Sequence, residues 1–156
     1  MKKLILISLI VLLTLPVWFT GATAVHAEEM TCPEHTPVSI DIRPGEAPNK
    51  INLSAKGLLP VAVLTTPDFD ASHFAPEMAH LSDARIAMSM GCVGAEAVRW
   101  NYTDVNRDGR LDIVFFFRIQ ELNLTSGSTA ATLMAHGSYG SSMIHIHGTD
   151  SVKVKP

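Results

Sequence analysis

The amino-acid sequence predicts an all-β fold, namely an antiparallel β-sandwich of roughly seven to nine short strands with one short helical turn. Two observations lead to this prediction. Apolar and polar residues alternate with a period of two over most of the chain beyond residue 37, which is the pattern of half-buried strands. Gly and Pro residues separate these segments at short intervals, as they do in turns between strands.

The first 27 residues are expected to lie outside this fold, because they have the organisation of a secretory signal peptide. Lys2 and Lys3 provide a basic start, and residues 4–17 are almost continuously apolar. Residues 24–27, Ala-Val-His-Ala, have small residues at their first and last positions, as cleavage sites do. The apolar run is short for a membrane span and contains Pro16, so cleavage is favoured over an uncleaved anchor.

Cleavage after Ala27 leaves residues 28–156, which is the length of one domain. We expect residues 28–37 to form an N-terminal tail and residues 38–156 to form the β-sandwich. Loss of the two signal-peptide lysines changes the formal net charge from −3 to −5, and no basic cluster remains, so nucleic acid is not an expected partner. The protein is expected to be secreted or periplasmic, with no membrane attachment after cleavage.

Cys32 and Cys92 are the two cysteines of the chain. Because an exported protein enters an oxidising compartment, a disulfide bond between them is predicted, and two free thiols are the alternative. A bridge of this length would stabilise the fold by roughly 4 kcal/mol at most on a chain-entropy estimate. The two residues do not form a C-x-x-C pair, so neither a zinc site nor redox catalysis is indicated.

Strands are predicted wherever the alternation, or an apolar run, continues between turn formers. They are residues 38–42, 51–53, 58–65, 84–88, 98–102, 111–119, 129–135, 143–147 and 152–154. The run at residues 58–65 is typical of a strand buried on both faces. In the segment that follows it, Asp70 is positioned to cap a single helical turn through Phe74, which ends before Pro76.

Two of these strands are expected to form a hairpin. Val98, Trp100 and Tyr102 alternate on the first strand, and Leu111, Ile113, Phe115, Phe117 and Ile119 alternate on the second. Both sets are expected to point inward, with Phe116 on the opposite face. The acidic residues between the two strands therefore form the loop of this hairpin.

This loop, residues 104–112, reads Asp-Val-Asn-Arg-Asp-Gly-Arg-Leu-Asp and matches most of an EF-hand calcium loop. Gly109 at the sixth position permits the sharp turn, whereas Phe115 occupies the twelfth position, where an EF-hand carries its bidentate Glu. The loop is therefore similar to the shortened calcium loops of dockerins and thrombospondin type 3 repeats. The expected ligands are the side chains of the first, third, fifth and ninth residues and the carbonyl of the seventh, namely Asp104, Asn106, Asp108, Asp112 and Arg110.

Calcium (Ca²⁺) is the expected cofactor. Without a cation, Asp104, Asp108 and Asp112 would repel one another in a compact loop. A metal-free acidic turn is the alternative, because Asp, Asn and Gly also form turns. Magnesium suits the loop less well, because it demands a stricter octahedron and retains more of its waters. A loop between strands, unlike one between helices, does not predict a calmodulin-type switch.

Several segments together resemble a domain of secreted bacterial proteins that opens with I-D-I-K-P-G…P-N-x-I-N…K-G-x-x-P-V-A-I-L-T-T. The segments are Val-Ser-Ile-Asp-Ile-Arg-Pro-Gly at 38–45, Pro-Asn-Lys-Ile-Asn at 48–52, Lys-Gly-Leu-Leu-Pro-Val-Ala-Val-Leu-Thr-Thr at 56–66, Phe-Asp-Ala at 69–71, Asp-Val-Asn-Arg-Asp-Gly at 104–109 and Gly-Thr-Asp-Ser-Val at 148–152. The resemblance therefore covers most of residues 38–154.

This resemblance implies a calcium-associated β domain with a structural or binding role, and it implies no particular activity. An extracellular protein or a carbohydrate is the class of partner that such a module would have. The sequence departs from the family pattern at Arg107, where Gly is common, and at residues 128–130, where an acidic residue is common. Neither departure changes an oxygen ligand of the loop.

A periplasmic copper- or metal-handling protein is the first alternative function. His145 and His147 are two residues apart on a predicted strand, so they share a face with Met143. Imidazoles bind copper or zinc, and thioethers favour Cu(I). The competing interpretation is a solvated strand face opposite the core residues Ile144 and Ile146.

A small secreted enzyme is the second alternative. Serines at 126, 128, 141 and 142 lie in predicted turns, and His136 is near them in the sequence. The chain contains no G-x-S-x-G element, so these serines are interpreted as turn formers. No catalytic residue is assigned, and the protein is not expected to be an enzyme.

Overall fold

A computed structural model describes residues 35–90 and 93–156 of the chain. The predicted signal peptide, most of the predicted tail and both cysteines lie outside the described residues. The described elements, in chain order, are β1 (His35–Pro37), β2 (Ile40–Ile42), β3 (Lys50–Asn52), β4 (Leu58–Val63), η1 (Ala71–His73), β5 (Phe74–Asp83), α1 (Ala84–Met90), β6 (Ala95–Thr103), β7 (Asp112–Arg118), η2 (Ile119–Glu121), β8 (Ala130–Tyr139), β9 (Ser142–Ser151) and β10 (Lys153–Lys155). In this part of the chain, no helix is both long and apolar enough to cross a bilayer.

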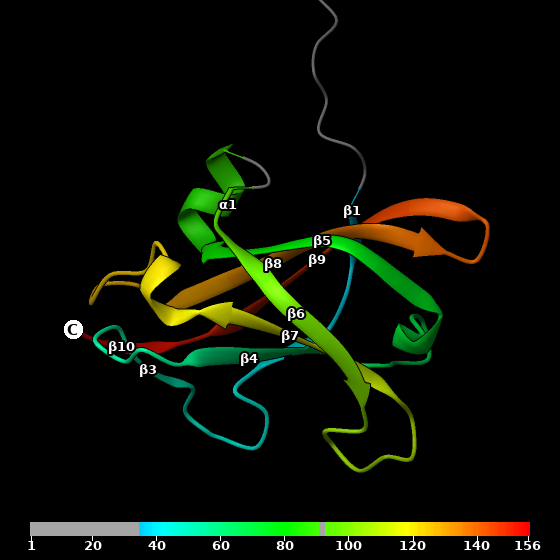
Figure 1. Cartoon of the computed structure of the whole chain (residues 1–156), viewed down its shortest axis with the longest axis horizontal. Coiled ribbons are helices and arrows are strands. Elements are labelled where there is room, and N and C mark those ends of the chain that lie inside the picture. The colour runs from blue at the N-terminus through cyan, green and yellow to red at the C-terminus, as the bar shows by residue number, and fades with distance from the viewer. Residues whose placement is uncertain (1–34, 91–92) are drawn as a thin grey trace, which may run out of the picture. The chain divides into compact units, whose positions relative to one another are not determined.

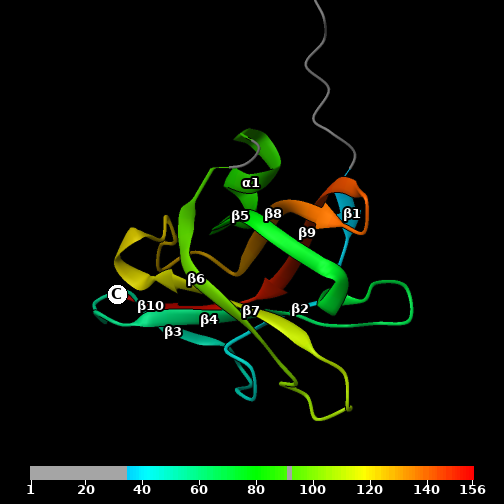
Figure 2. The ribbon, with the colours of Figure 1, turned by 45° about the vertical axis from the view of Figure 1, so that its right-hand side comes forward.

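The predicted all-β class is confirmed. Eight strands form one sheet in the order β1-β9-β8-β5-β6-β7-β4-β2, and β10 pairs with β3 in a separate two-stranded sheet. The two layers of the expected sandwich are thus two halves of one curled sheet, which can be followed in Figures 1 and 2. Most pairs are antiparallel, whereas β1 is parallel to β9 and β10 is parallel to β3.

The two ends of the curled sheet are formed by neighbouring segments of the chain. β1 and β2 are consecutive in sequence, yet β1 lies at one end of the strand order and β2 at the other. Val38 donates its N–H to the carbonyl of His147 in β9, and the next residue, Ser39, accepts from the N–H of Leu64 beyond β4. Residues 28–37 were expected to form an N-terminal tail. The last three of them form β1 and belong to the sheet.

β6 is the strand at which the sheet passes from one layer to the other. It pairs with β5 only at Glu96 and Ala95, and then with β7 over its remaining length. The register shifts between Ala97 and Arg99, so Val98 forms a bulge and is 39% exposed, against the expectation that it points inward.

Two aromatic residues of β6 lie at the margin of the core. Trp100 and Tyr102 pair with Phe115 and Ile113 and so face inward, yet they are 40% and 41% exposed. At this point β6 no longer pairs with β5, although the hydroxyl of Tyr102 donates to the carbonyl of Phe74, the first residue of β5, at 2.8 Å. Leu111 was also expected inward but is 50% exposed, because it precedes the first residue of β7.

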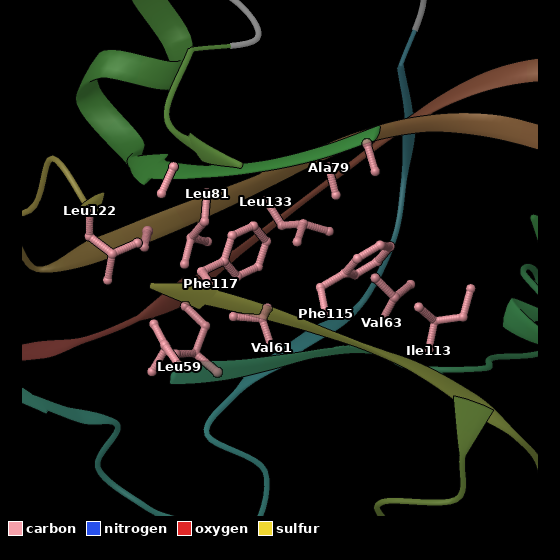
Figure 3. Packing of buried hydrophobic residues seen from close by; sticks show 14 of the residues in the cluster. Leu59, Val61, Val63, Ala79, Leu81, Ile113, Phe115, Phe117, Leu122 and Leu133 are labelled. Atoms are coloured by element: carbon pink, nitrogen blue, oxygen red, sulfur yellow. The ribbon is translucent and has the colours of Figure 1, made fainter. Parts of the chain in front are cut away.

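The hydrophobic core lies between the two layers (Figure 3). Phe115 and Phe117 of β7 and Val61 of β4 point from one layer toward Leu81 of β5 and Leu133 of β8 in the other. All five side chains are inaccessible to solvent. As predicted, Phe116 points to the opposite face, where the guanidinium of Arg99 lies 3.9 Å from the centre of its ring.

The prediction of a strand at residues 84–88 is wrong, because α1 occupies this range. Asp83 accepts a hydrogen bond from the N–H of Arg85 at 2.9 Å, as a helix N-cap does. Ala84 and Ala87 are both buried, a spacing of three that suits a helix and not a strand. The predicted cap of the other helical turn is present, since Asp70 accepts from the N–H of Ser72 at the start of η1.

Gly148 permits the close crossing at which the two ends of the sheet meet. A Cβ atom at this position would lie 2.5 Å from the Cγ2 of Ile40 and 2.7 Å from the carbonyl oxygen of Val38. Both neighbours belong to the segment that closes the sheet, and one of them is backbone. We therefore expect that this position accepts no larger residue without displacement of that segment.

Replacement of Gly148 by Ala should lower the free energy of unfolding by about 1–3 kcal/mol, because the added methyl group overpacks the crossing. Gly57→Ala is the matched control, because a Cβ there would meet no atom within 4 Å. Urea unfolding of both variants measures the difference. Equal stabilities of the two variants would contradict the conclusion that the crossing has no room for a Cβ atom at position 148.

Candidate functional site

The acidic loop connects β6 and β7, as the sequence predicts, and its polar side chains bind its own backbone. Asp104 accepts hydrogen bonds from the N–H groups of Asp108 at 3.2 Å and Gly109 at 2.9 Å, one on each carboxylate oxygen. The side-chain oxygen of Asn106 also accepts from the N–H of Asp108, at 3.0 Å. Arg107 and Gly109 adopt positive φ angles of 62° and 85°, a region of backbone conformation that favours glycine.

Within the loop, Asp108 pairs with the cationic side chain of Arg110, which would compete with a metal ion for this carboxylate. One of its oxygens accepts from the N–H of Arg110 at 2.9 Å, and the other lies 3.0 Å from the guanidinium of the same residue. The Arg110 backbone N–H, followed by the guanidinium, lowers the pKa of Asp108 below its ordinary value, so this carboxylate is ionised at neutral pH. A metal ion at Asp108 would have to share this carboxylate with Arg110.

Asp112 lies beneath the loop and is completely buried. Its Oδ1 accepts from the N–H of Thr65 at 2.8 Å, and its Oδ2 accepts from the N–H of Val105 at 3.0 Å. The hydroxyl of Thr65 in turn donates to the carbonyl of Leu111 and accepts from the N–H of Ala71. Asp112 therefore ties the base of the loop to the segment that follows β4.

The predicted calcium ligands thus differ in their exposure to solvent. Asp104, Asn106 and Asp108 lie in the exposed part of the hairpin loop, whereas Asp112 is turned into the protein. Among residues 35–90 and 93–156, no three His, Cys, Asp or Glu side chains are already grouped around one point. An ion in this loop would therefore require some side chains to rotate, and a role for Asp112 as a ligand stays a prediction.

The segments that carry the family resemblance meet around a shallow pocket of about 640 Å³. Asp41 lines it from the first segment, Asn49 from the second and Asp150 from the last, and Glu46 lines it from between the first two. Asp150 accepts from the N–H of Ile42 at 3.0 Å and from the side-chain amide of Asn49 at 2.8 Å. Burial, followed by the neighbouring carboxylate of Asp150, raises the pKa of Asp41 above its ordinary value.

Histidine side chains gather on the outer face of β1, β9 and β8. His145 lies between His35 and His136, with ring centroids 5.5 Å and 5.6 Å away. His147 was expected beside His145 from its spacing, whereas His35 and His136 were not assigned to this face. Only the register of the strands brings these distant residues together, so no sequence pattern could have placed them.

We compared the chain with protein-family models, with curated proteins and with solved structures, and none matched. The functional interpretation therefore depends on the geometry described above.

Replacement of Asp112 by Asn should lower the free energy of unfolding by about 1–3 kcal/mol in the presence of a calcium chelator, because an amide cannot accept from both buried N–H groups. Asp68→Asn, at an exposed position in the loop before η1, serves as the control. Urea unfolding monitored by tryptophan fluorescence checks this expectation. A variant as stable as the control would exclude a structural role for the Asp112 carboxylate.

Proposed function

We propose that this chain is an exported calcium-binding β domain with a structural or binding role, and that the ion binds in the loop of residues 104–112. The observation that carries the proposal is the buried carboxylate of Asp112 below an acidic loop. Its two oxygens are bonded to backbone amides, which do not neutralise its charge. Burying a negative charge without a positive charge nearby costs free energy. A cation in the adjoining loop would therefore stabilise the Asp112 carboxylate as well as the side chains that bind the ion directly.

The donor set favours calcium over other cations. Side-chain oxygens of Asp104, Asn106 and Asp108 and the carbonyl of Arg110 are hard ligands, which Ca²⁺ accepts in flexible geometries. Hydrogen bonds from the loop amides to these side chains orient them while leaving lone pairs on the same oxygens. Mg²⁺ requires a near-ideal octahedron, which is a more demanding condition for a loop whose ligands must still rotate.

Bound calcium would hold the β6–β7 hairpin loop in one conformation. An ion that binds only the folded state adds stability by mass action. The exposed aromatic residues Trp100 and Tyr102 lie on β6, close to the loop in sequence. Tyr and Trp are frequent at binding surfaces, so the ordered loop and these aromatics together would suit an extracellular protein or a carbohydrate.

Asp104→Ala and Asp108→Ala should each remove specific calcium binding, because each deletes a carboxylate from the proposed ligand set. The unfolding temperature of the unmodified protein should rise on addition of calcium, and that of either variant should not. Isothermal titration with CaCl₂ measures binding directly, and Asp68→Ala controls for the loss of one exposed carboxylate. Unchanged calcium affinity in both loop variants would refute the proposed site.

Arg110→Gln should increase calcium affinity by roughly threefold to tenfold, because it removes a positive charge that competes for Asp108 and keeps the backbone carbonyl. Arg118→Gln is the matched control, since Arg118 also pairs with a carboxylate, that of Glu121, but on η2. Calcium titrations at low ionic strength compare the two variants. If both change the affinity equally, the contact between Arg110 and Asp108 does not oppose binding.

A further inference from the structure

The strand register creates a histidine row, which we define as His35, His145 and His136. His35 of β1 pairs with His145 of β9, and His145 pairs with His136 of β8. The row therefore crosses three adjacent strands at one level of the sheet. His147 lies one level further along β9, and its ring centroid is 5.9 Å from that of His35.

Buried ring nitrogens without a hydrogen-bond partner concentrate on this face. Among the described residues, such atoms are the Nδ1 atoms of His35, His80, His145 and His147. Buried polar atoms are normally paired, and each unpaired one costs free energy. Four unpaired imidazole nitrogens on one face of a sheet are groups that a bound metal ion could satisfy.

Thioether and carboxylate groups surround the row. Met78 of β5 pairs with His136, and Met134 of β8 pairs with His147 on one side and His80 on the other. The register shift between Pro76 and Met78 brings the carboxylate of Glu77 to 4.0 Å from the Nε2 of His136. The donors available on this face are therefore mainly nitrogen and sulfur, in contrast to the oxygen donors of the calcium loop.

We propose that this face is a copper site in which the imidazoles of His35, His145 and His147, each with an unpaired Nδ1, are the ligands. Imidazole suits several first-row metals, but copper also accepts thioether sulfur and has the highest affinity among the divalent ions of this series. The proposal is independent of the calcium site, because Ca²⁺ prefers oxygen ligands.

The ring spacing is compatible with shared coordination. Two imidazoles that bind one ion at a nitrogen–metal distance of about 2.0 Å hold their ring centroids roughly 4.5–6 Å apart. The separations of 5.5 Å from His35 to His145 and 5.9 Å from His35 to His147 lie within this range. The three rings do not yet point at one centre in the described structure, so coordination requires rotations of these half-buried side chains.

The test uses untagged protein and CuCl₂ in competition with a chelator of known copper affinity. Replacing both His145 and His147 by Thr, which suits strand positions, should weaken Cu²⁺ binding at least tenfold and leave calcium binding unchanged. His73→Thr is the matched control, because His73 is exposed on η1 and lies outside the row. Equal copper affinity in the double variant, the control and the unmodified protein would overturn the proposal.

A measurement on the unmodified protein keeps the test valid if the double variant does not fold. Substoichiometric Cu²⁺ should broaden the imidazole proton NMR signals of His35, His145 and His147 before that of His73. Simultaneous broadening of all four signals would mean that copper binds any exposed imidazole, and it would refute the site. Because calcium binding is measured separately, failure of the calcium site leaves this result interpretable.

Discussion

The fold depends on one short segment, residues 35–42, which forms both ends of the eight-stranded sheet. Val38 bonds to β9 and Ser39 bonds to the residue after β4, so two consecutive residues join the two layers. Gly148 lets the backbones cross closely, and the carboxylate of Asp150 on β9 binds the N–H of Ile42 on β2. Because this closure brings the inner faces together, the core around Phe115 and Phe117 becomes dry. An open sheet of the same strands would leave these side chains in water.

Two regions of the fold differ in donor chemistry. Hard oxygen donors gather at the β6–β7 loop, where Asp112 ties the loop to the end of β4. Nitrogen and sulfur donors gather on the outer face of β1, β9, β8 and β5. Since Ca²⁺ and copper select opposite donor types, the two proposed sites would not compete for one ion. Each proposal can therefore be tested and rejected without the other.

Much of the fold could be predicted because alternation is a local property of the chain. Most of the predicted strands, the helical turn capped by Asp70, and the hairpin that carries the acidic loop are present. The failures have local physical causes. At residues 84–88, burial at a spacing of three replaces alternation, and at Val98 a bulge interrupts it. β5 was missed because Pro76 and a bulge interrupt its pattern near its start, while its last residues are buried regardless of alternation.

The sequence by itself determined the all-β class, the inward positions of Phe115 and Phe117, and an acidic loop between two strands. These features depend on residues that are close in the chain, where spacing alone decides which side chains share a face. The tertiary structure alone decided that Asp112 is buried against the N–H of Thr65 and that His35 and His136 flank His145. Those contacts join residues far apart in sequence. They depend on strand register, and a shift of one residue would turn each side chain to the opposite face of the sheet.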